Sequence, residues 1–245
     1  MQAMIFAAGL GTRLQPLTNK NPKALVEING KTLLERCIVR LKEQGITDIV
    51  INVHHEASLI IDFLKRKNDF GLDIQISDET KELLDTGGGI LKANALLKKN
   101  MPVLIVNVDV LTNLSFKELM EYHSSKKALA TLVVRQRETA RYLLFDERNQ
   151  LTGWKNIKTG DSKVSRPIEF LKSKPYAFSG IHIIQPELIS MIEERGKFSI
   201  IDLYLRLAKT QRIHAFIDDK SEWMDLGKYE QLKEAENMVK RLDQK

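Results

Sequence analysis

Two patterns of hydrophobic and polar positions alternate along the first half of the chain. Short, nearly continuous apolar runs are typical of buried parallel strands, and apolar residues that recur every three or four positions are typical of helices packed on a sheet. The predicted strands are residues 3–8, 48–53, 73–77, 103–108 and 128–134. The predicted helices are residues 32–44, 57–67, 89–99 and 115–124. This succession predicts an α/β fold with a mainly parallel central sheet and helices on both faces.

The pattern changes after about residue 135. Short stretches of alternating polarity predict antiparallel strands that cover one end of the main sheet, at residues 142–146, 150–155 and 176–184. Further elements are predicted as helices from Pro186, at residues 200–209 and from about Lys228, and as a strand at residues 213–217. Because no linker rich in Gly, Ser or Pro separates the halves, we expect residues 1–245 to form a single domain.

The ends of the predicted strands are the expected place for function. In parallel sheets of this kind, ligands bind beyond the carboxyl ends of the strands. The polar residues that follow the predicted strands are residues 9–13, 52–55 and 78–79, together with Asp109.

The composition excludes several other classes of protein. A single cysteine, Cys37, rules out an internal disulfide and fits a reducing compartment, so we expect a cytoplasmic protein. No apolar run approaches the roughly 20 residues that a membrane span needs, and no basic segment typical of a signal peptide precedes the first apolar residues. The net charge of +6 is spread among interspersed acids and bases, without a basic patch interleaved with aromatics. We therefore expect neither a nucleic acid nor a membrane as partner.

A glycine-containing loop, G-L-G-T-R at residues 9–13, follows the first predicted strand. Small residues directly after a buried strand allow backbone N–H groups to approach a phosphate closely. Arg13 offers a planar fork for phosphate oxygens, and Lys23 offers a second cation. The Walker pattern is absent, and Leu14 stands where the dinucleotide-binding pattern needs a third glycine. The loop therefore indicates phosphate binding of another kind.

The stretch from Ile5 to Val26 resembles the N-terminal signature of the sugar-nucleotide pyrophosphorylases, which are nucleotidyltransferases with a Rossmann-like core. The family pattern is an apolar strand, then A-A-G-x-G-T-R-[LM] and P-K-[PA]-[LM], and the chain matches it at residues 7–14 and 22–25. The resemblance implies a nucleotide-binding half at residues 1–135 and a smaller, antiparallel sugar-binding half at residues 136–245. It implies nucleotide contacts from Ala8, Gly9, Gly11, Thr12, Arg13, Lys23 and, later in the chain, Asn107.

A second glycine-rich segment, L-D-T-G-G-G-I at residues 84–90, resembles the family segment that leads into the third helix. Gly87 and Gly88 allow the backbone to lie against a base or ribose. Asp78 and Glu79 fall where the family reads the edge of the base. The D-T-G-G-G-I form is most similar to short bacterial members that act on N-acetylmuramate 1-phosphate, and it also occurs in relatives that handle mannose- or heptose-type 1-phosphates.

Two carboxylates resemble the metal ligands of the family. N-V-D at residues 107–109 stands where the family usually has Gly-Asp, so Val108 departs from the pattern while Asp109 keeps the carboxylate. W-M-D-L-G at residues 223–227 resembles W-x-D-x-G, whose acidic residue is Asp225 here. The resemblance implies Mg2+ held by these two carboxylates together with triphosphate oxygens. The catalytic residues that it implies are Arg13, Lys23, Asp109 and Asp225.

The sugar side of the resemblance lies later in the chain. F-S-G-I at residues 178–181 resembles the strand that lines the sugar pocket, which assigns sugar contacts to Ser179 and Gly180. Glu169 corresponds to the acidic residue that contacts sugar hydroxyls. Many members have a lysine directly after this residue to hold the sugar phosphate, but Phe170 stands here. The candidates for that role are Lys155, Lys172 and Lys174.

The resemblance implies transfer of a nucleotidyl group from a nucleoside triphosphate to a sugar 1-phosphate, with release of pyrophosphate. The short length and the D-T-G-G-G-I form favour UTP with a sugar such as N-acetylmuramate 1-phosphate. The alternatives are a guanylyltransferase for a mannose- or heptose-type 1-phosphate and, from another class, a non-catalytic protein that binds a sugar nucleotide. We expect a monomer or homodimer without a C-terminal β-helix domain.

Overall fold

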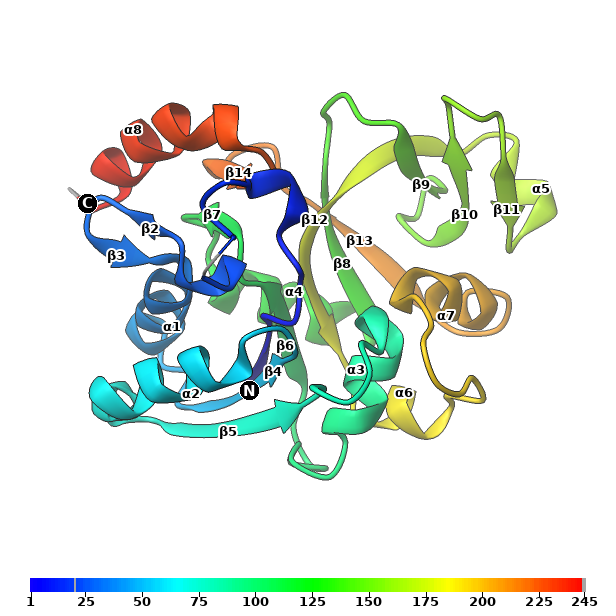
Figure 1. The fold of residues 1–245 in the computed structure, drawn as a ribbon. Helices are drawn as coiled ribbons and strands as arrows, with labels where there is room; N and C mark the ends of the chain where they lie inside the picture. Colours follow the sequence, from blue (N-terminus) through cyan, green and yellow to red (C-terminus); the bar gives the residue numbers. More distant parts are fainter. Residues whose placement is uncertain (20, 244–245) are drawn as a thin grey trace.

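Four parallel strands form the first part of the central sheet in the computed structural model, which describes residues 1–19 and 21–243 (Figure 1). Their spatial order is β5, β4, β1, β6, and their bounds are β1 (Gln2–Phe6), β4 (Asp48–Val53), β5 (Asp73–Asp78) and β6 (Val103–Asn107). All four lie within about two residues of the predicted ranges. The strand β1 is central because its side chains are buried on both faces of the sheet, as a continuous apolar run requires.

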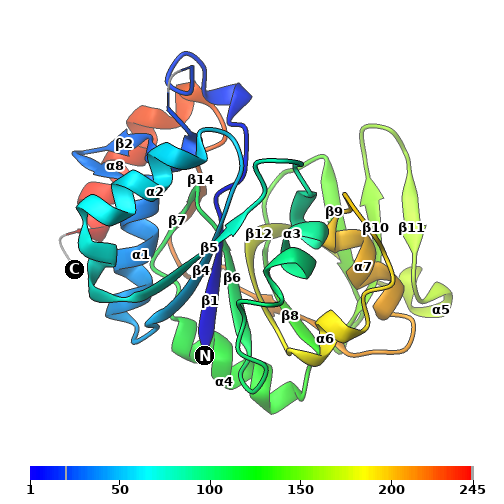
Figure 2. The same cartoon turned by 60° about the horizontal axis from the view of Figure 1, so that its bottom comes forward.

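Helices cover both faces of this sheet (Figure 2). One face packs against α1 (Leu33–Glu43), α2 (Ala57–Arg66) and α4 (Phe116–Lys126), and α8 (Leu232–Leu242) extends the same core away from the sheet. The other face packs against α3 (Asp85–Ala93), α6 (Glu187–Ser190) and α7 (Ile200–Leu207). Successive side chains of β1 point to opposite faces of the sheet. Ala3 and Ile5 therefore belong to the first core and Met4 to the second. The predicted Rossmann-like arrangement is confirmed.

The long strand β12 (Lys174–Ile184) joins the two halves of the chain. On one side it pairs antiparallel with β6, and on the other with β8 (Ala130–Arg135) and β9 (Arg141–Phe145). The predicted strand at residues 128–134 therefore forms as β8, but β12 separates it from the four parallel strands. The sheet is completed by β10 (Leu151–Asn156) and β11 (Ser162–Val164) beyond β9, and by β13 (Ile213–Ile217), which is parallel to β8.

Several short elements escape the sequence pattern. Two small antiparallel ladders pair β7 (Val110–Thr112) with β14 (Trp223–Asp225), and β2 (Glu27–Ile28) with β3 (Lys31–Thr32). Single helical turns are η1 (Thr12–Leu14), η2 (Lys23–Leu25), η3 (Asn68–Gly71), η4 (Tyr229–Gln231) and the four-residue helix α5 (Pro167–Phe170). Strands of two or three residues are too short to show a period of two, which is why the sequence did not reveal them.

Two further expectations concern burial and membranes. Cys37 is buried in α1 and is not in a disulfide, and burial raises the pKa of its thiol to about 12, so core packing is its role. Within residues 1–19 and 21–243, none of the helices combines the length and the apolar character required to cross a lipid bilayer.

Candidate active site

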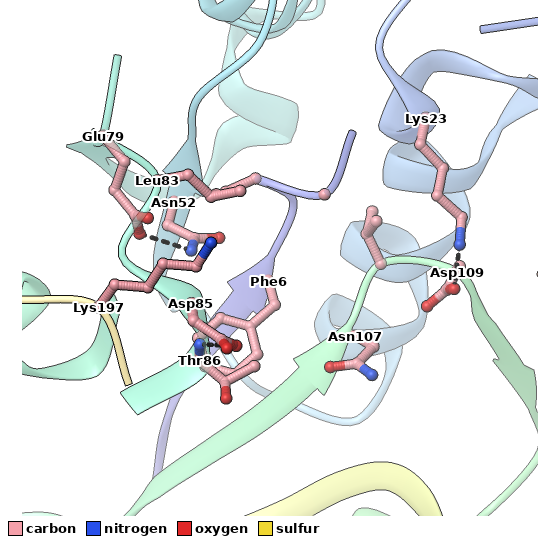
Figure 3. Close-up of a pocket in the computed structure, with 13 residues that line it drawn as sticks. Phe6, Lys23, Asn52, Glu79, Leu83, Asp85, Thr86, Asn107, Asp109 and Lys197 are labelled. Atoms are coloured by element: carbon pink, nitrogen blue, oxygen red, sulfur yellow. Dashed lines mark hydrogen bonds and ion pairs between the residues drawn. The ribbon is translucent and has the colours of Figure 1, made fainter. Parts of the chain in front are cut away.

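A cavity of about 370 Å³ opens at the carboxyl ends of β1 and β6, as the strand-end argument predicts (Figure 3). Six of the predicted site residues line it, namely Ala8, Gly9, Lys23, Glu79, Asn107 and Asp109. The side chains at one side of the cavity are Lys23 and Asp109, and Asn52, Glu79, Asp85, Thr86 and Lys197 lie at the other (Figure 3). The two sides differ in chemistry, and each is built by a different set of loops.

Lys23 and Asp109 form an ion pair at the first side of the cavity (Figure 3). Their side chains are only 12% and 17% exposed, so water screens this pair less than it screens a surface pair. Lys23 begins the turn η2 directly after Pro22, which fixes the direction of the backbone. The sequence segment P-K-A-L therefore places an ammonium group directly on the carboxylate that follows β6.

The glycine loop encloses the stem of Lys23. Gly11 has a φ of +65°, and a Cβ atom at this position would lie 2.9 Å from the Thr18 methyl group and 3.0 Å from Cβ of Lys23. The hydroxyl of Thr18 donates to the carbonyl of Gly11 at 2.9 Å and closes the loop. Only glycine satisfies both the positive φ and the close packing. Gly11 therefore shapes the loop around Lys23, while Thr12 is exposed at its surface.

Arg13 reaches the segment that carries Asp225. Both terminal nitrogens of the exposed Arg13 lie 3.8 Å from the position that a Cβ atom would occupy at Gly227. Gly227 is the last residue of W-M-D-L-G, so the first and last signature segments of the chain are in contact. Its lack of a side chain leaves room for the guanidinium group.

The β7–β14 ladder brings Asp225 next to Asp109. Asp225 is the register partner of Val110, and the N–H of Leu226 donates to the carbonyl of Asp109 at 2.9 Å. Within the described residues, no cluster of three or more His, Cys, Asp or Glu side chains is arranged to hold a metal ion. Two carboxylates are nevertheless the protein ligands that Mg2+ typically uses when a phosphate substrate supplies the rest. The donor set therefore fits a Mg2+ ion that arrives with a nucleotide.

The second side of the cavity contains a buried amide–carboxylate pair. Asn52 Nδ2 donates to Glu79 Oε1 at 2.7 Å, and Asn52 Oδ1 accepts from the N–H of Ala7 at 2.8 Å. Glu79 Oε2 accepts from the N–H of Leu84 at 3.1 Å. The pair is 3% and 0% exposed, so these hydrogen bonds fix the ends of β1, β4 and β5 relative to one another.

Asp78 and Glu79 were predicted together, but the structure separates them. Asp78 is exposed. Hydrogen bonds from the hydroxyl and from the backbone N–H of Thr80 lower the pKa of the Asp78 carboxyl. It does not line the cavity, whereas its neighbour Glu79 does. Successive residues at a strand end point in opposite directions, which accounts for the difference.

The three glycines at residues 87–89 lie inside α3, which begins at Asp85 rather than at the predicted residue 89. A Cβ atom at Gly87 would lie 2.2 Å from the Phe198 ring, and one at Gly88 would lie 2.4 Å from the carbonyl oxygen of Gly196. These glycines thus admit another segment of the protein against the helix. Gly87 and Gly88 do not line the cavity, so the predicted contact with a base or ribose stays a prediction.

Ser179 and Gly180, which were predicted to contact the sugar, lie beside other predicted segments of the site. Gly180 has a φ of +74°, and a Cβ atom there would lie 2.7 Å from Asn107 Nδ2, so this predicted sugar residue lies against a predicted nucleotide residue. Ser179 is fully buried and accepts at its carbonyl from Trp223 Nε1 at 2.9 Å. Gly180 thus lies against a residue that lines the cavity, and Ser179 is hydrogen-bonded to β14.

Glu169 lies apart from the cavity. It is on α5 at the outer edge of the sheet, where its carboxylate accepts from Arg166 at 2.7 Å (Figure 1). The three candidate lysines for the sugar phosphate, Lys155, Lys172 and Lys174, are exposed and none of them lines the cavity. Their contact with the sugar phosphate therefore stays a prediction.

The lining residues that were not predicted as site residues include Leu83, Asp85, Thr86 and Lys197. Leu83, Asp85 and Thr86 lie in or beside the quoted motif, so their position after β5 was a usable signal. Lys197 lies in a loop between α6 and α7, and nothing in the sequence separates it from the other lysines.

Comparison with known proteins identifies a family and several relatives that this chain resembles. A family model described as nucleotidyl transferase matches residues 2–241. Mannose-1-phosphate guanyltransferase 2 of Candida glabrata is 34% identical over 232 residues, which cover 93% of this chain and 61% of that protein. N-acetylmuramate alpha-1-phosphate uridylyltransferase of Caulobacter vibrioides is 34% identical over 232 residues, covering 92% of this chain and 91% of that protein. The chain thus spans 61% of the length of its guanyltransferase relatives.

Solved structures give the same fold. HddC from Yersinia pseudotuberculosis, in complex with GMP-PN, is 25% identical with a TM-score of 0.75, and the match covers 97% of this chain and 99% of that chain. A putative glucose-1-phosphate thymidylyltransferase from Bacillus anthracis has a TM-score of 0.79 at 19% identity, covering 98% and 95%. At that identity the likeness concerns the fold alone.

Proposed function

The chain belongs to the nucleotidyl transferase family, and we propose that it transfers a nucleotidyl group from a nucleoside triphosphate to a sugar 1-phosphate. The products are an NDP-sugar and pyrophosphate. The observation that carries the proposal is the meeting of Lys23, Asp109 and the Asp225 strand beside one cavity at the carboxyl ends of the central strands.

The chemistry needs positioning more than a strong base. An oxygen of the sugar phosphate attacks the α-phosphorus, and the bond to the bridging oxygen breaks, so that pyrophosphate leaves with the electron pair. A phosphate nucleophile is already ionised near neutral pH. In this proposal Lys23 neutralises charge on the α-phosphate and Arg13 holds the leaving pyrophosphate. The contacts of Lys23 with Asp109 and of Arg13 with the segment that carries Asp225 support these roles.

We assign the metal to Asp109 and Asp225. When bound, Mg2+ supplies charge neutralisation and a common anchor for the phosphate oxygens. In the structure the ammonium group of Lys23 pairs with Asp109. A nucleotide that brings its metal would release Lys23 from that pairing and make it available to the α-phosphate.

For the sugar phosphate we propose Arg137 as a further candidate cation; like the three lysines it does not line the cavity, but it contacts β14. Its guanidinium group lies 4.8 Å from the centre of the Trp223 ring, and it donates to the carbonyl of Phe178 at 3.3 Å. Trp223 and Asp225 lie two positions apart on β14, so their side chains share one face of the strand. Arg137 is therefore held on the face that carries the Asp225 carboxylate, and a guanidinium group suits phosphate oxygens.

For the substrates, UTP and a sugar such as N-acetylmuramate 1-phosphate are proposed first. The Caulobacter relative, which is named for that reaction, is matched over nearly its whole length. The alternative is GTP with a mannose- or heptose-type 1-phosphate. It is supported by the names of the yeast relatives and by the GMP-PN complex of HddC.

The test is pyrophosphate release with Mg2+, using UTP, GTP, dTTP, CTP and ATP against N-acetylmuramate, mannose, heptose and glucose 1-phosphates. Release with one pairing, abolished by EDTA, is the expected result. Nucleotide binding without release from any pairing would instead support the non-catalytic alternative. Failure to bind any nucleotide would contradict both.

The remaining expectations are carried forward as proposals. Residues 1–245 would act as one nucleotidyltransferase unit, because β12 belongs to both halves of the sheet. The cytoplasmic location and the monomeric or homodimeric state stay predictions.

A further inference from the structure

The two sides of the cavity suit different parts of a nucleotide. Lys23 and the glycine loop provide positive charge and backbone N–H groups at one side, which suits a triphosphate. The other side contains the carboxylates of Glu79 and Asp85 and the apolar side chain of Leu83 (Figure 3). A polyanion would be repelled by these carboxylates, so the base belongs on this side.

Most polar atoms on the base side already have partners. Asn52 and Glu79 bind each other and the backbone, and Thr86 Oγ1 accepts from the N–H of Ile200 at 2.9 Å. Lys197 differs. Its ammonium group extends toward the cavity and has no hydrogen bond or ion pair with any residue in the described part of the chain (Figure 3).

The backbone on either side of Lys197 is fixed against the start of α3. The N–H of Gly87 donates to the carbonyl of Phe198 at 2.9 Å, and the N–H of Phe198 donates to the carbonyl of Leu84 at 3.2 Å. The Phe198 ring fills the space over Gly87 that a side chain would otherwise take. Lys197 is thus presented to the cavity by a fixed segment, although it comes from the sugar-binding half of the chain.

We propose that Lys197 selects the base of the nucleoside triphosphate by donating to an exocyclic carbonyl oxygen. An ammonium donor beside the exposed carboxylate of Asp85 complements a carbonyl next to a ring N–H, which uracil, thymine and guanine present. Cytosine and adenine present an amino group next to a ring nitrogen that accepts. Against that edge the ammonium meets a donor and the Asp85 carboxylate meets an acceptor. This proposal rests on the proposed function and narrows its substrate to nucleotides whose base presents a carbonyl next to a ring N–H.

The test replaces Lys197 by methionine, which keeps the length of the side chain and removes the charge. Arg195→Met is the matched control, because Arg195 is an exposed cation on the same segment and does not line the cavity. Dissociation constants are measured for UTP, GTP, CTP and ATP, and kcat/KM is measured with the sugar 1-phosphate that the panel identifies.

The wild type is expected to prefer UTP or GTP over CTP and ATP. In K197M, binding of the preferred nucleotide should weaken about 10- to 100-fold, as loss of a charged hydrogen bond to a neutral group implies. Binding of CTP and ATP should change little, so that the selectivity ratio falls by a similar factor. R195M should keep the wild-type ratio.

Other outcomes would overturn the proposal. Equal weakening for all four nucleotides would mean that Lys197 binds phosphate or ribose, and an unchanged ratio would mean that it does not read the base. A wild type that prefers CTP or ATP would contradict base selection while leaving nucleotidyl transfer intact. Because dissociation constants do not depend on turnover, base selection is decided even if no sugar 1-phosphate is accepted.

Discussion

Lys23 and Asp109 form an ion pair in the structure, and the proposed function gives each of them a different task. The ion pair stabilises the loop after β6 and keeps a carboxylate and an ammonium group partly buried in the same cavity. Removing one partner leaves the other charge without compensation. Variants at this pair therefore report on catalysis only when the stability of the fold is measured alongside.

Asp109→Asn is expected to lower turnover about 100-fold or more, because the amide keeps the shape of the side chain but loses the charge that the metal needs. Pyrophosphate release measures the loss, and circular dichroism checks the fold. Asp62→Asn, on the exposed face of α2, is the matched control and should retain normal turnover. Turnover of D109N near that of the control would remove Asp109 from the metal site.

Arg137→Met should raise the KM for the sugar 1-phosphate about 10-fold while the KM for the nucleotide stays within about twofold, because one charged contact to the acceptor phosphate is lost. Steady-state kinetics with each substrate varied in turn separates the two. Arg212→Met, at an exposed position before β13, serves as the control. A rise confined to the nucleotide KM would mean that Arg137 binds the nucleotide and not the sugar 1-phosphate.

Among elements, the start of α3 shows how little a glycine motif specifies by itself. The glycines of D-T-G-G-G-I were expected to lie against a base or ribose, and this contact stays a prediction; in the structure they lie against Phe198 and Gly196. A glycine pattern states that something approaches closely, and it does not state what. The neighbouring Asp85 and Thr86 face the cavity instead.

Gly87→Ala is expected to lower the free energy of unfolding by about 1–3 kcal/mol, because the new methyl group would lie inside the van der Waals radius of the Phe198 ring. The loss should appear although alanine favours a helix by about 1 kcal/mol over glycine. Denaturant unfolding measures it.

The double variant with Phe198→Ala is the sharper test of that packing. If the ring and the methyl group compete for one space, the two losses will not add, and the coupling will amount to about 1 kcal/mol or more. Additive losses would show that Gly87 is required for another reason. In both variants the dissociation constant of the preferred nucleotide should rise, because Lys197 depends on the same segment.

The pairing of β7 with β14 could not be predicted from the sequence. Asp109 and Asp225 were placed in their roles by motif resemblance, but their adjacency follows from two three-residue strands that have no visible periodicity. The strand ends after β1, β4 and β5 were predictable because long apolar runs fix those strands. Lys197 and Arg137 were not, since a lone cation on a loop has no pattern.

At the scale of the whole molecule, stability depends on two buried histidines, His182 on β12 and His123 on α4. His182 is enclosed by Phe6, Phe178 and Tyr204, and burial lowers its pKa to about 3. His123 is also buried, which lowers its pKa to about 4. An unfolded chain protonates both near pH 6.5, whereas the folded chain does not. Their contribution is therefore fully present above about pH 6.5 and is lost progressively as the pH falls toward 4 and 3.

Between pH 7 and pH 5, each of these histidines should lower the free energy of unfolding by about 2 kcal/mol. His182→Phe isolates one of them, because neither ring nitrogen of His182 has a hydrogen-bond partner among residues 1–19 and 21–243, and phenylalanine suits the aromatic surroundings. Urea unfolding at pH 7, 6 and 5 should give a shallower pH dependence for the variant, by about 1.4 kcal/mol per pH unit below pH 6.5. Parallel curves would mean that His182 is protonated in the folded protein.

The β7–β14 ladder can form only after both of its strands have been synthesised. Thr112 and Glu222, which hydrogen-bond at its end, are 110 positions apart in the chain. At about 5–20 residues per second, the ribosome releases Asp109 roughly 5–20 seconds before the strand that carries Asp225. During that interval the nascent chain can fold its parallel strands but lacks one of the two carboxylates. Under the proposed function, a chain made only as far as β7 therefore lacks one of the two proposed metal ligands and is expected not to consume nucleotide.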